Sequence, residues 1–210
     1  MVAALSHQTA MSGRFRGFLP VVIDIETGGF EPRTDAILEL AAVLLEYDGD
    51  RLLPGRVLHY HVEPLEGTRL DPESLKFLGI DPFHPLREAV SEHDAFRAFF
   101  AEVRGAVKQN GCKRAIVVAH NASFDQQFIS AAAGRNALKR NPFHPFSSID
   151  TASLAAVAYG HTVLSQACAR AGIGFDSNEA HTALYDAGVT AQLFCAIVNR
   201  WQQMGGWPPP

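Results

Sequence analysis

The chain has 210 residues, 47% of them hydrophobic, and a formal net charge of −4. This length and composition favour one compact domain with a sizeable core. The slightly acidic balance excludes a general attraction for polyanions, so any contact with nucleic acid must come from a local basic strip.

The number and spacing of the cysteines, together with the hydropathy of the chain, indicate the cellular compartment. The cysteines are odd in number, far apart and without a C-x-x-C pair, which is typical of reduced thiols, so we expect a cytoplasmic protein. The first residues, through Gln8, lack the charged and apolar regions of a signal peptide, and no stretch offers eighteen consecutive apolar residues. We therefore expect no membrane partner.

We expect a single domain over residues 14–207, with a flexible N-terminal arm over residues 1–13 and a C-terminal tail over residues 208–210. Apolar runs and turn residues predict three early strands with short links, and later strands that alternate with helices. The predicted strands cover residues 20–27, 36–46, 56–63, 115–119 and 147–150. The predicted helices cover residues 72–78, 91–110, 122–138, 151–159, 163–171 and 181–203. This order favours an α/β fold, a mixed sheet with helices on both faces.

Two carboxylates, Asp24 and Glu26, interrupt the apolar run of the first strand. Side chains of a strand alternate between its faces, so these two acids share one face. Two buried like charges require a cation, because an unpaired carboxylate in a dry site costs several kcal/mol. The alternative is a solvent-facing edge strand that carries ordinary surface acids.

Two later segments bring further acids toward the same edge of the sheet. Asp125 lies in the first turn of a helix that follows a buried strand, and Asp186 lies in the last predicted helix. His181 precedes Asp186 by five residues, which on a helix leaves them roughly 140° apart. We therefore expect His181 in the loop or frayed turn before that helix, where its ring can swing over the site.

Four carboxylates without sulfur ligands favour hard cations, here two Mg²⁺ with Mn²⁺ as the alternative. Two such ions, about 4 Å apart, stabilise the attacking and leaving oxygens of an in-line displacement at phosphorus. The imidazole of His181 can take a proton from the attacking water near neutral pH. These residues predict metal-assisted hydrolysis of phosphodiester bonds.

The motifs resemble a known family. Asp24-x-Glu26-Thr-Gly, Asn121-x-x-Phe124-Asp125 and His181-x-x-x-x-Asp186 resemble the three exonuclease motifs of the DEDD superfamily in its histidine branch. Segments that begin at Arg14, Lys139 and Asn199 are similar to the bacterial ribonuclease T family, so the resemblance covers nearly the whole chain. It implies a ribonuclease H-like fold with a five-stranded mixed sheet. It also implies 3′→5′ removal of nucleotides, as 5′-monophosphates, from single-stranded 3′ ends.

The resemblance also implies a role for individual residues. Metal ligands are matched by Asp24, Glu26, Asp125 and Asp186, and the general base by His181. Aromatic side chains that stack on the last bases are matched by Phe30, Phe77, Phe124 and Phe146, and the contact to the terminal base by Glu73. The sequence has 14 Phe residues, and for each of them packing in the core is the ordinary alternative. Phe30 and Phe124 are the strongest candidates for stacking, because each adjoins a metal-ligand motif.

Basic residues match a patch that grips RNA away from the active site in this family: Arg14, Arg16, Lys108, Arg114 and Lys139. There the patch of one subunit faces the catalytic centre of the other, which implies a homodimer. Taken singly, each of these residues also fits an ordinary solvated surface charge.

The resemblance implies RNA 3′ ends as partners, those of tRNA, rRNA precursors and other small stable RNAs, together with single-stranded DNA and slower removal of a terminal cytosine. Two alternatives stay open. A proofreading exonuclease subunit of a DNA polymerase would carry the same catalytic residues, and a binding module of the same fold would lack hydrolysis.

Two histidines, His59 and His61, alternate on the third predicted strand. A metal site would need a third ligand, and none lies near them in the sequence, so we interpret them as edge-strand residues. Glu39, on the second predicted strand, receives no role from the sequence.

Overall fold

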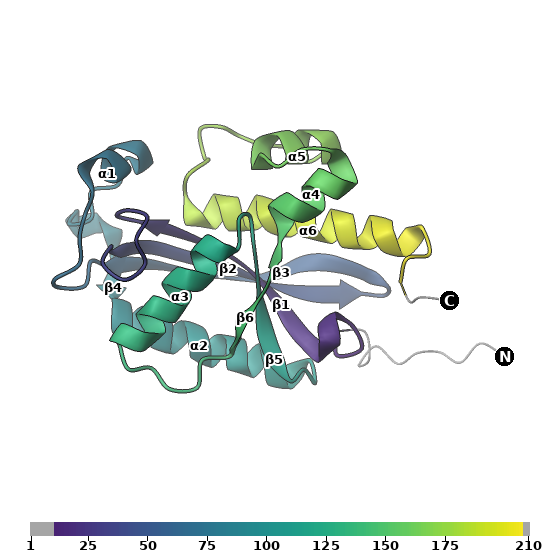
Figure 1. Cartoon of the computed structure of the whole chain (residues 1–210), viewed down its shortest axis with the longest axis horizontal. Helices are drawn as coiled ribbons and strands as arrows, with labels where there is room; N and C mark the ends of the chain where they lie inside the picture. Colours follow the sequence, from purple (N-terminus) through teal and green to yellow (C-terminus); the bar gives the residue numbers. More distant parts are fainter. Residues whose placement is uncertain (1–10, 208–210) are drawn as a thin grey trace.

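The structure is a computed structural model that describes residues 11–207, and in them a six-stranded mixed sheet lies between two layers of helices (Figure 1). The strand order is β4-β3-β2-β1-β5-β6. The strands are β1 (Phe18–Thr27), β2 (Ile37–Asp48), β3 (Arg51–Glu63), β4 (Val90–Ser91), β5 (Arg114–Ala119) and β6 (Phe143–Asp150). The helices are α1 (Pro72–Leu78), α2 (Glu92–Gln109), α3 (Ser123–Arg135), α4 (Thr151–Tyr159), α5 (Leu164–Ala171) and α6 (Ala183–Gln203), with 3₁₀ turns at Phe15–Gly17 and Pro85–Arg87.

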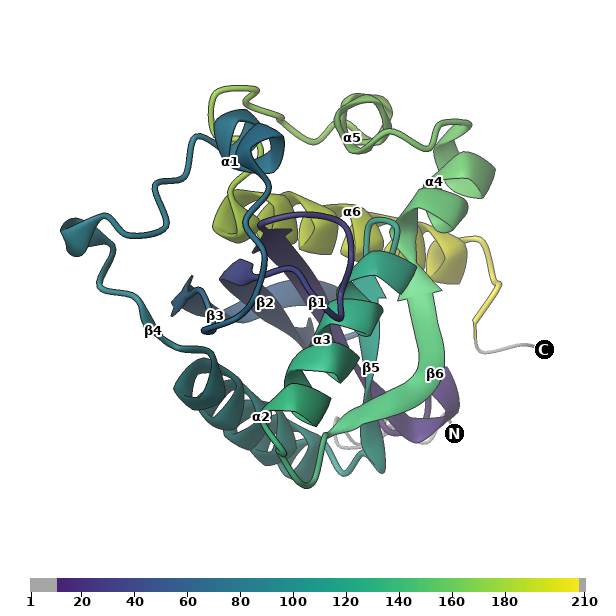
Figure 2. The same cartoon turned by 60° about the vertical axis from the view of Figure 1, so that its left-hand side comes forward.

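The helices cover the sheet unequally. The long helix α6 crosses β1, β2 and β3 on one face, with α4 and α5 outside it, and α2 and α3 lie on the other face (Figures 1 and 2). Phe96, Phe99 and Phe100 of α2 are fully buried, as are Phe128 of α3 and Phe194 of α6. These aromatic side chains fill the space between the sheet and its two helical layers. In residues 11–207 no helix combines the length and apolar character needed to cross a membrane.

The predicted α/β fold is confirmed, with differences in the lengths of elements. The antiparallel start is found in β1, β2 and β3, and the two-residue strand β4 adds an edge beside β3 that the five-stranded expectation lacks. Both β3 and β6 begin earlier than predicted, at Arg51 and Phe143. The last helix begins at Ala183 and not at His181, because Thr182 caps it by accepting a hydrogen bond from the Tyr185 amide.

The expected terminal segments lie mostly outside the described residues, which omit residues 1–10 and 208–210. The end of the predicted arm is described, and Met11 there is buried in the main core. Met11 therefore packs with the domain.

The two central parallel strands separate at one end. The ladder between β1 and β5 ends at the pair Val22 and Val118, whereas β1 continues to Thr27 and stays paired with β2. Beyond Val22 the β5 side of β1 is open to the start of α3. This gap receives the acidic residues of β1 and α3.

A buried ion pair joins the start of α2 to the end of α3. Arg135 donates from Nε to Glu92 Oε1 over 2.7 Å and from Nη1 to the Pro32 carbonyl over 3.0 Å. The Glu92 side chain is fully buried and that of Arg135 is 15% exposed. The pair thus fastens the loop after β1 to both helices.

Replacing Glu92 with Ala is expected to lower the free energy of unfolding by about 3 kcal/mol, because Arg135 would stay buried without its counter-ion. Urea unfolding measures the loss. Arg56→Ala is the matched control, since it breaks the exposed 2.8 Å pair with Glu102 and should cost less than about 1 kcal/mol. Equal losses in the two variants would contradict this account.

Candidate active site

Two acids of β1 face α6. Asp24 and Glu26 alternate with Ile23 and Ile25, which are buried on the opposite face. The sequence predicted this alternation, and the structure places both carboxylates where β1 has parted from β5.

The third acid enters from the other side of the gap. Asp125 is 4% exposed in the first turn of α3, where the positive end of the helix dipole favours a carboxylate. Its carboxylate accepts hydrogen bonds from its own amide and from the amide of Ile25 on β1. The start of α3 is thereby tied to the open side of β1.

The fourth acid and the histidine come from the start of α6. The His181 amide donates to Asp186 Oδ2 over 3.2 Å, and His181 adopts a left-handed backbone conformation with φ of 67°. Its ring lies 4.5 Å from the ring of Phe77. As predicted, His181 precedes the helix, so its side chain is exposed beside the acids and is not fixed on a helical face.

The carboxylates converge. Asp24, Glu26 and Asp186 each offer an oxygen, and these oxygens all lie within 4.8 Å of one another. Asp125 joins them electrostatically, since it is the largest of the neighbouring charges that raise the pKa of Asp24. The structure therefore places three of the four acids that the sequence singled out around one point, and the fourth, Asp125, close enough to act on Asp24.

Burial and mutual repulsion raise the pKa values of these carboxyl groups. Burial, followed by the charges of Asp186 and Glu39, raises the pKa of Glu26 to about 7. Burial and the charge of Glu26 raise the pKa of Asp125 to about 8. The pKa of Asp24 is raised by burial and by the charges of Asp125 and Glu26. A cation would reverse these shifts by favouring the charged forms.

The donor set fits a hard divalent cation. Every converging ligand is a carboxylate oxygen, the type that Mg²⁺ and Mn²⁺ prefer. Asp186 Oδ1 is buried and has no hydrogen-bond partner among residues 11–207. A bound cation would satisfy this oxygen, so the residues present suit the predicted metal.

An aromatic pocket adjoins the acids. A cleft of about 430 Å³ is lined by Glu26, by three of the predicted stacking residues and by the predicted base contact: Phe30, Phe77, Phe124 and Glu73. Phe30 is 83% exposed and Phe77 67% exposed. Such exposure of large rings departs from core packing and leaves their faces free for a planar ligand.

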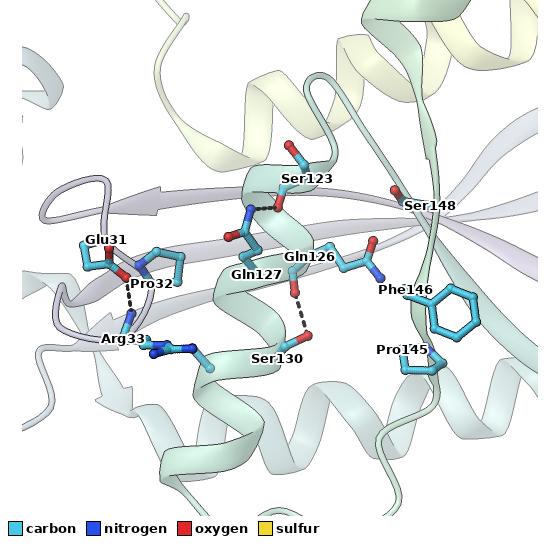
Figure 3. A pocket seen from close by; sticks show the side chains of 11 residues that line it. Glu31, Pro32, Arg33, Ser123, Gln126, Gln127, Ser130, Pro145, Phe146 and Ser148 are labelled. Carbon is cyan, nitrogen blue, oxygen red and sulfur yellow. Dashed lines mark hydrogen bonds between the residues drawn. The ribbon is translucent and has the colours of Figure 1, made fainter.

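Phe146 lies in a different groove. This groove has a volume of about 550 Å³, and Phe146 and Pro145 line it with Gln126 and Ser130 of α3 and with Arg33 (Figure 3). Figure 3 shows the α3 side chains between Arg33 and the β6 residues. Phe146 is 81% exposed, so it shares the exposure of the other predicted stacking residues but not their pocket.

Four of the predicted basic residues are exposed, namely Arg16, Lys108, Arg114 and Lys139. Arg114 begins β5 and pairs with Phe18, which begins β1. The acids lie near the opposite end of β1, so the basic residues at the start of these strands are remote from the acidic centre of their own chain.

Arg14 differs from the expectation that it belongs to this exposed strip. It is only 7% exposed, and its Nη1 donates to Gln202 Oε1 over 2.9 Å. The guanidinium lies 5.3 Å from the centre of the Phe15 ring and 5.4 Å from that of Trp207. Arg14 thus packs Gln202 and Trp207 against the turn before β1, and it is less exposed than the other four predicted basic residues.

The sequence interpretation of His59 and His61 also requires a correction. It assumed that no third ligand lies near them, but Glu39 lies directly opposite His61 in the pairing of β2 with β3. His59 Nε2 is 2.6 Å from Glu39 Oε1. A bulge near residues 43–45 shifts the register of the two strands by one residue, so counting outward from the turn would have placed Glu39 opposite Tyr60 and missed this neighbour.

Comparison with known proteins agrees with the geometry. A family model described as Exonuclease matches residues 21–194. A protein named Ribonuclease T from Yersinia enterocolitica is 59% identical over 210 residues, which cover 100% of this chain and 98% of the relative. Ribonuclease T from Photorhabdus laumondii is 60% identical over 199 residues, 94% of this chain and 92% of the relative.

Solved structures are similar in fold. The crystal structure of E. coli Exonuclease I in complex with a dT13 oligonucleotide matches with a TM-score of 0.67 and 16% identity. The match covers 90% of this chain but only 43% of the Exonuclease I chain. At this identity the likeness supports the fold alone, which is the expected ribonuclease H-like α/β arrangement.

The raised pKa values predict that the metal-free protein loses stability as pH rises. Glu26 has an ordinary pKa of 4.5 and a folded value of about 7, so the folded state binds more protons than the unfolded state. Stability must therefore fall as pH rises through this interval. Thermal unfolding in EDTA at several pH values measures this, and added Mg²⁺ should offset the loss at pH 8.

Glu26→Gln should make this pH dependence shallower, because it removes one of the carboxyl groups whose pKa is raised in the folded state. Glu66→Gln, which changes an exposed loop carboxylate, should leave it unaltered. A parent-like slope in Glu26→Gln would show that Glu26 does not carry the shift.

Proposed function

The chain belongs to the exonuclease family, and we propose that this 3′→5′ exonuclease trims the single-stranded 3′ ends of tRNA, rRNA precursors and other stable RNAs. The observation that carries the proposal is the convergence of acids from β1, α3 and α6 beside His181 and an exposed aromatic pocket. The full-length likeness to proteins named Ribonuclease T favours RNA trimming over a polymerase proofreading subunit.

Each polar side chain of the centre has a part in the proposed reaction. Two divalent cations, Mg²⁺ or Mn²⁺, would supply charge neutralisation and Lewis acidity at the scissile phosphate. Asp24, Glu26, Asp125 and Asp186 would hold them. His181, exposed and anchored through its amide to Asp186, accepts the proton that the attacking water releases.

The aromatic pocket accounts for binding of a strand end without strict sequence preference. Phe30, Phe77 and Phe124 line it, and Glu73 lies at its α1 side. Stacking contributes about 1–3 kcal/mol per base and tolerates any base, because each base has a π-face. Single-stranded DNA offers the same faces, so we include it among the substrates.

The position of the basic residues favours a homodimer. Arg114 pairs with Phe18, whereas Asp24 lies six residues further along β1. At about 3.3 Å per residue this separates the strip from the acids of its own chain by roughly 20 Å. We propose that the strip of one subunit holds RNA that enters the centre of the other, in the cytoplasm, where the free cysteines stay reduced.

Asp24→Asn is expected to lower the hydrolysis rate by about 10²–10³-fold or more, since it removes charge that must stabilise the transition state. A 5′-labelled RNA oligonucleotide, resolved nucleotide by nucleotide, reports both the rate and the direction of shortening. Asp48→Asn, at the exposed end of β2, should keep the parent rate. Undiminished shortening in excess EDTA, or in Asp24→Asn, would refute the mechanism.

Lys139→Ala and Arg16→Ala are expected to weaken RNA binding while hydrolysis of a bound dinucleotide is preserved. Each should also reduce the slope of log affinity against log salt by about one, because one phosphate contact is lost. Fluorescence anisotropy with labelled single-stranded RNA measures both effects. Arg97→Ala removes an exposed cation paired with Asp94 on α2 and should change neither. Parent-like binding by Lys139→Ala and Arg16→Ala would exclude the strip as the RNA contact.

A further inference from the structure

A second group of metal-binding side chains lies on the same face of the sheet as the acidic centre. In the strand pairing Glu26 of β1 lies opposite Glu39 of β2, and Glu39 lies opposite His61 of β3. His59, two residues before His61, lies opposite Ala41. Directly opposed residues share a face. One row of side chains therefore runs from the acidic centre across β2 to two imidazoles on β3.

The three side chains of this group already approach one another. Glu39, His59 and His61 each offer one ligand atom, and these atoms all lie within 4.8 Å of one another. The rings of His59 and His61 have their centres 4.7 Å apart. Glu39 is 5% exposed, whereas both histidines are partly exposed. The carboxylate therefore lies at the buried side of the site, and an ion can reach it from solvent past the histidines.

We propose that Glu39, His59 and His61 form a further metal site that takes Zn²⁺ or a similar borderline divalent cation. Two imidazole nitrogens and one carboxylate oxygen form a ligand set that Zn²⁺ uses when a fourth position stays open. The neighbouring centre offers oxygen alone and prefers harder ions. The two groups thus differ in the cation they select, and the inference does not depend on the proposed substrate.

The observed contacts fit this occupant. His59 Nε2 and Glu39 Oε1 are 2.6 Å apart, so a hydrogen bond joins them. A tetrahedral ion with bonds of about 2.0–2.1 Å would replace the proton of this hydrogen bond and separate the two atoms modestly. The ion needs no new backbone conformation, because the histidines alternate on one regular strand.

Charges of both signs surround Glu39, His59 and His61, and they leave the Glu39 carboxylate available to a cation. Arg87 and Glu88 are the other charged residues that act on His61, one of each sign. The Arg87 guanidinium is held by the carbonyls of Pro82 and Leu38, to which it donates over 3.0 Å and 2.6 Å. The positive charge of Arg87 therefore repels a cation from a fixed position, but the guanidinium does not pair with the Glu39 carboxylate. Glu26, opposite Glu39, adds negative charge on the other side.

Zinc binding to the full-length chain tests the proposal. The Asp24→Asn variant, stripped with EDTA and kept in excess Mg²⁺, removes competition from the acidic centre. Calorimetric titration with ZnCl₂ should show one Zn²⁺ bound per chain. Adding His61→Ala should weaken this binding about 100-fold or more. Loss of a residue that only hydrogen-bonds to a metal ligand costs about 10–100-fold in metal affinity, and loss of a ligand itself should cost at least as much. His93→Ala, an exposed histidine of α2, is the matched control and should leave it unchanged.

Cobalt gives a second readout that does not depend on affinity. Co²⁺ bound through two imidazoles should give visible absorption bands in the Asp24→Asn chain, and His61→Gln should remove them while circular dichroism stays that of the parent. Equal Zn²⁺ affinity with and without His61, or no Zn²⁺ bound to the Asp24→Asn chain, would overturn the proposal. Failure of the RNA assays would leave these readouts unaffected.

Discussion

Repulsion among carboxylates packed at one point is the constraint on which the rest of the structure depends. Asp24 and Asp125 are deeply placed, and burial together with neighbouring carboxylates raises the pKa of each. Such a cluster is unfavourable for an isolated domain, and the ordinary remedy would be apolar replacement. Its presence in a well-packed fold is explained when divalent cations restore the ionised state and use the charge for hydrolysis.

Three features of the fold bring the carboxylates together. Strand alternation puts two acids of β1 on one face, the early end of the ladder between β1 and β5 opens a gap, and two helices begin at its rim. Asp125 and Asp186 both lie in first turns, where the helix dipole lowers the cost of negative charge. The same face continues through Glu39 to the imidazoles of β3, so neighbouring strands carry ligand sets of different hardness.

Local rules predicted the parts of the site that depend on local geometry. Alternation placed Asp24 beside Glu26, and helical rotation correctly put His181 outside α6. What the sequence missed depends on distant contacts. Arg14 is buried by packing against Gln202, far along the chain, and the partner of His61 follows from a hairpin register that a bulge near residues 43–45 shifts. The separation of Phe146 from the aromatic pocket likewise depends on how β6 passes α3.

The most direct measurement of the central claim is electron paramagnetic resonance of the wild-type protein loaded with Mn²⁺ in the presence of a single-stranded oligonucleotide. If acids of β1, α3 and α6 hold a pair of ions about 4 Å apart, the spectrum at saturation should show two magnetically coupled Mn²⁺ per chain. A spectrum of isolated Mn²⁺ at saturation, or no bound Mn²⁺, would contradict the claim that these carboxylates form a two-metal centre.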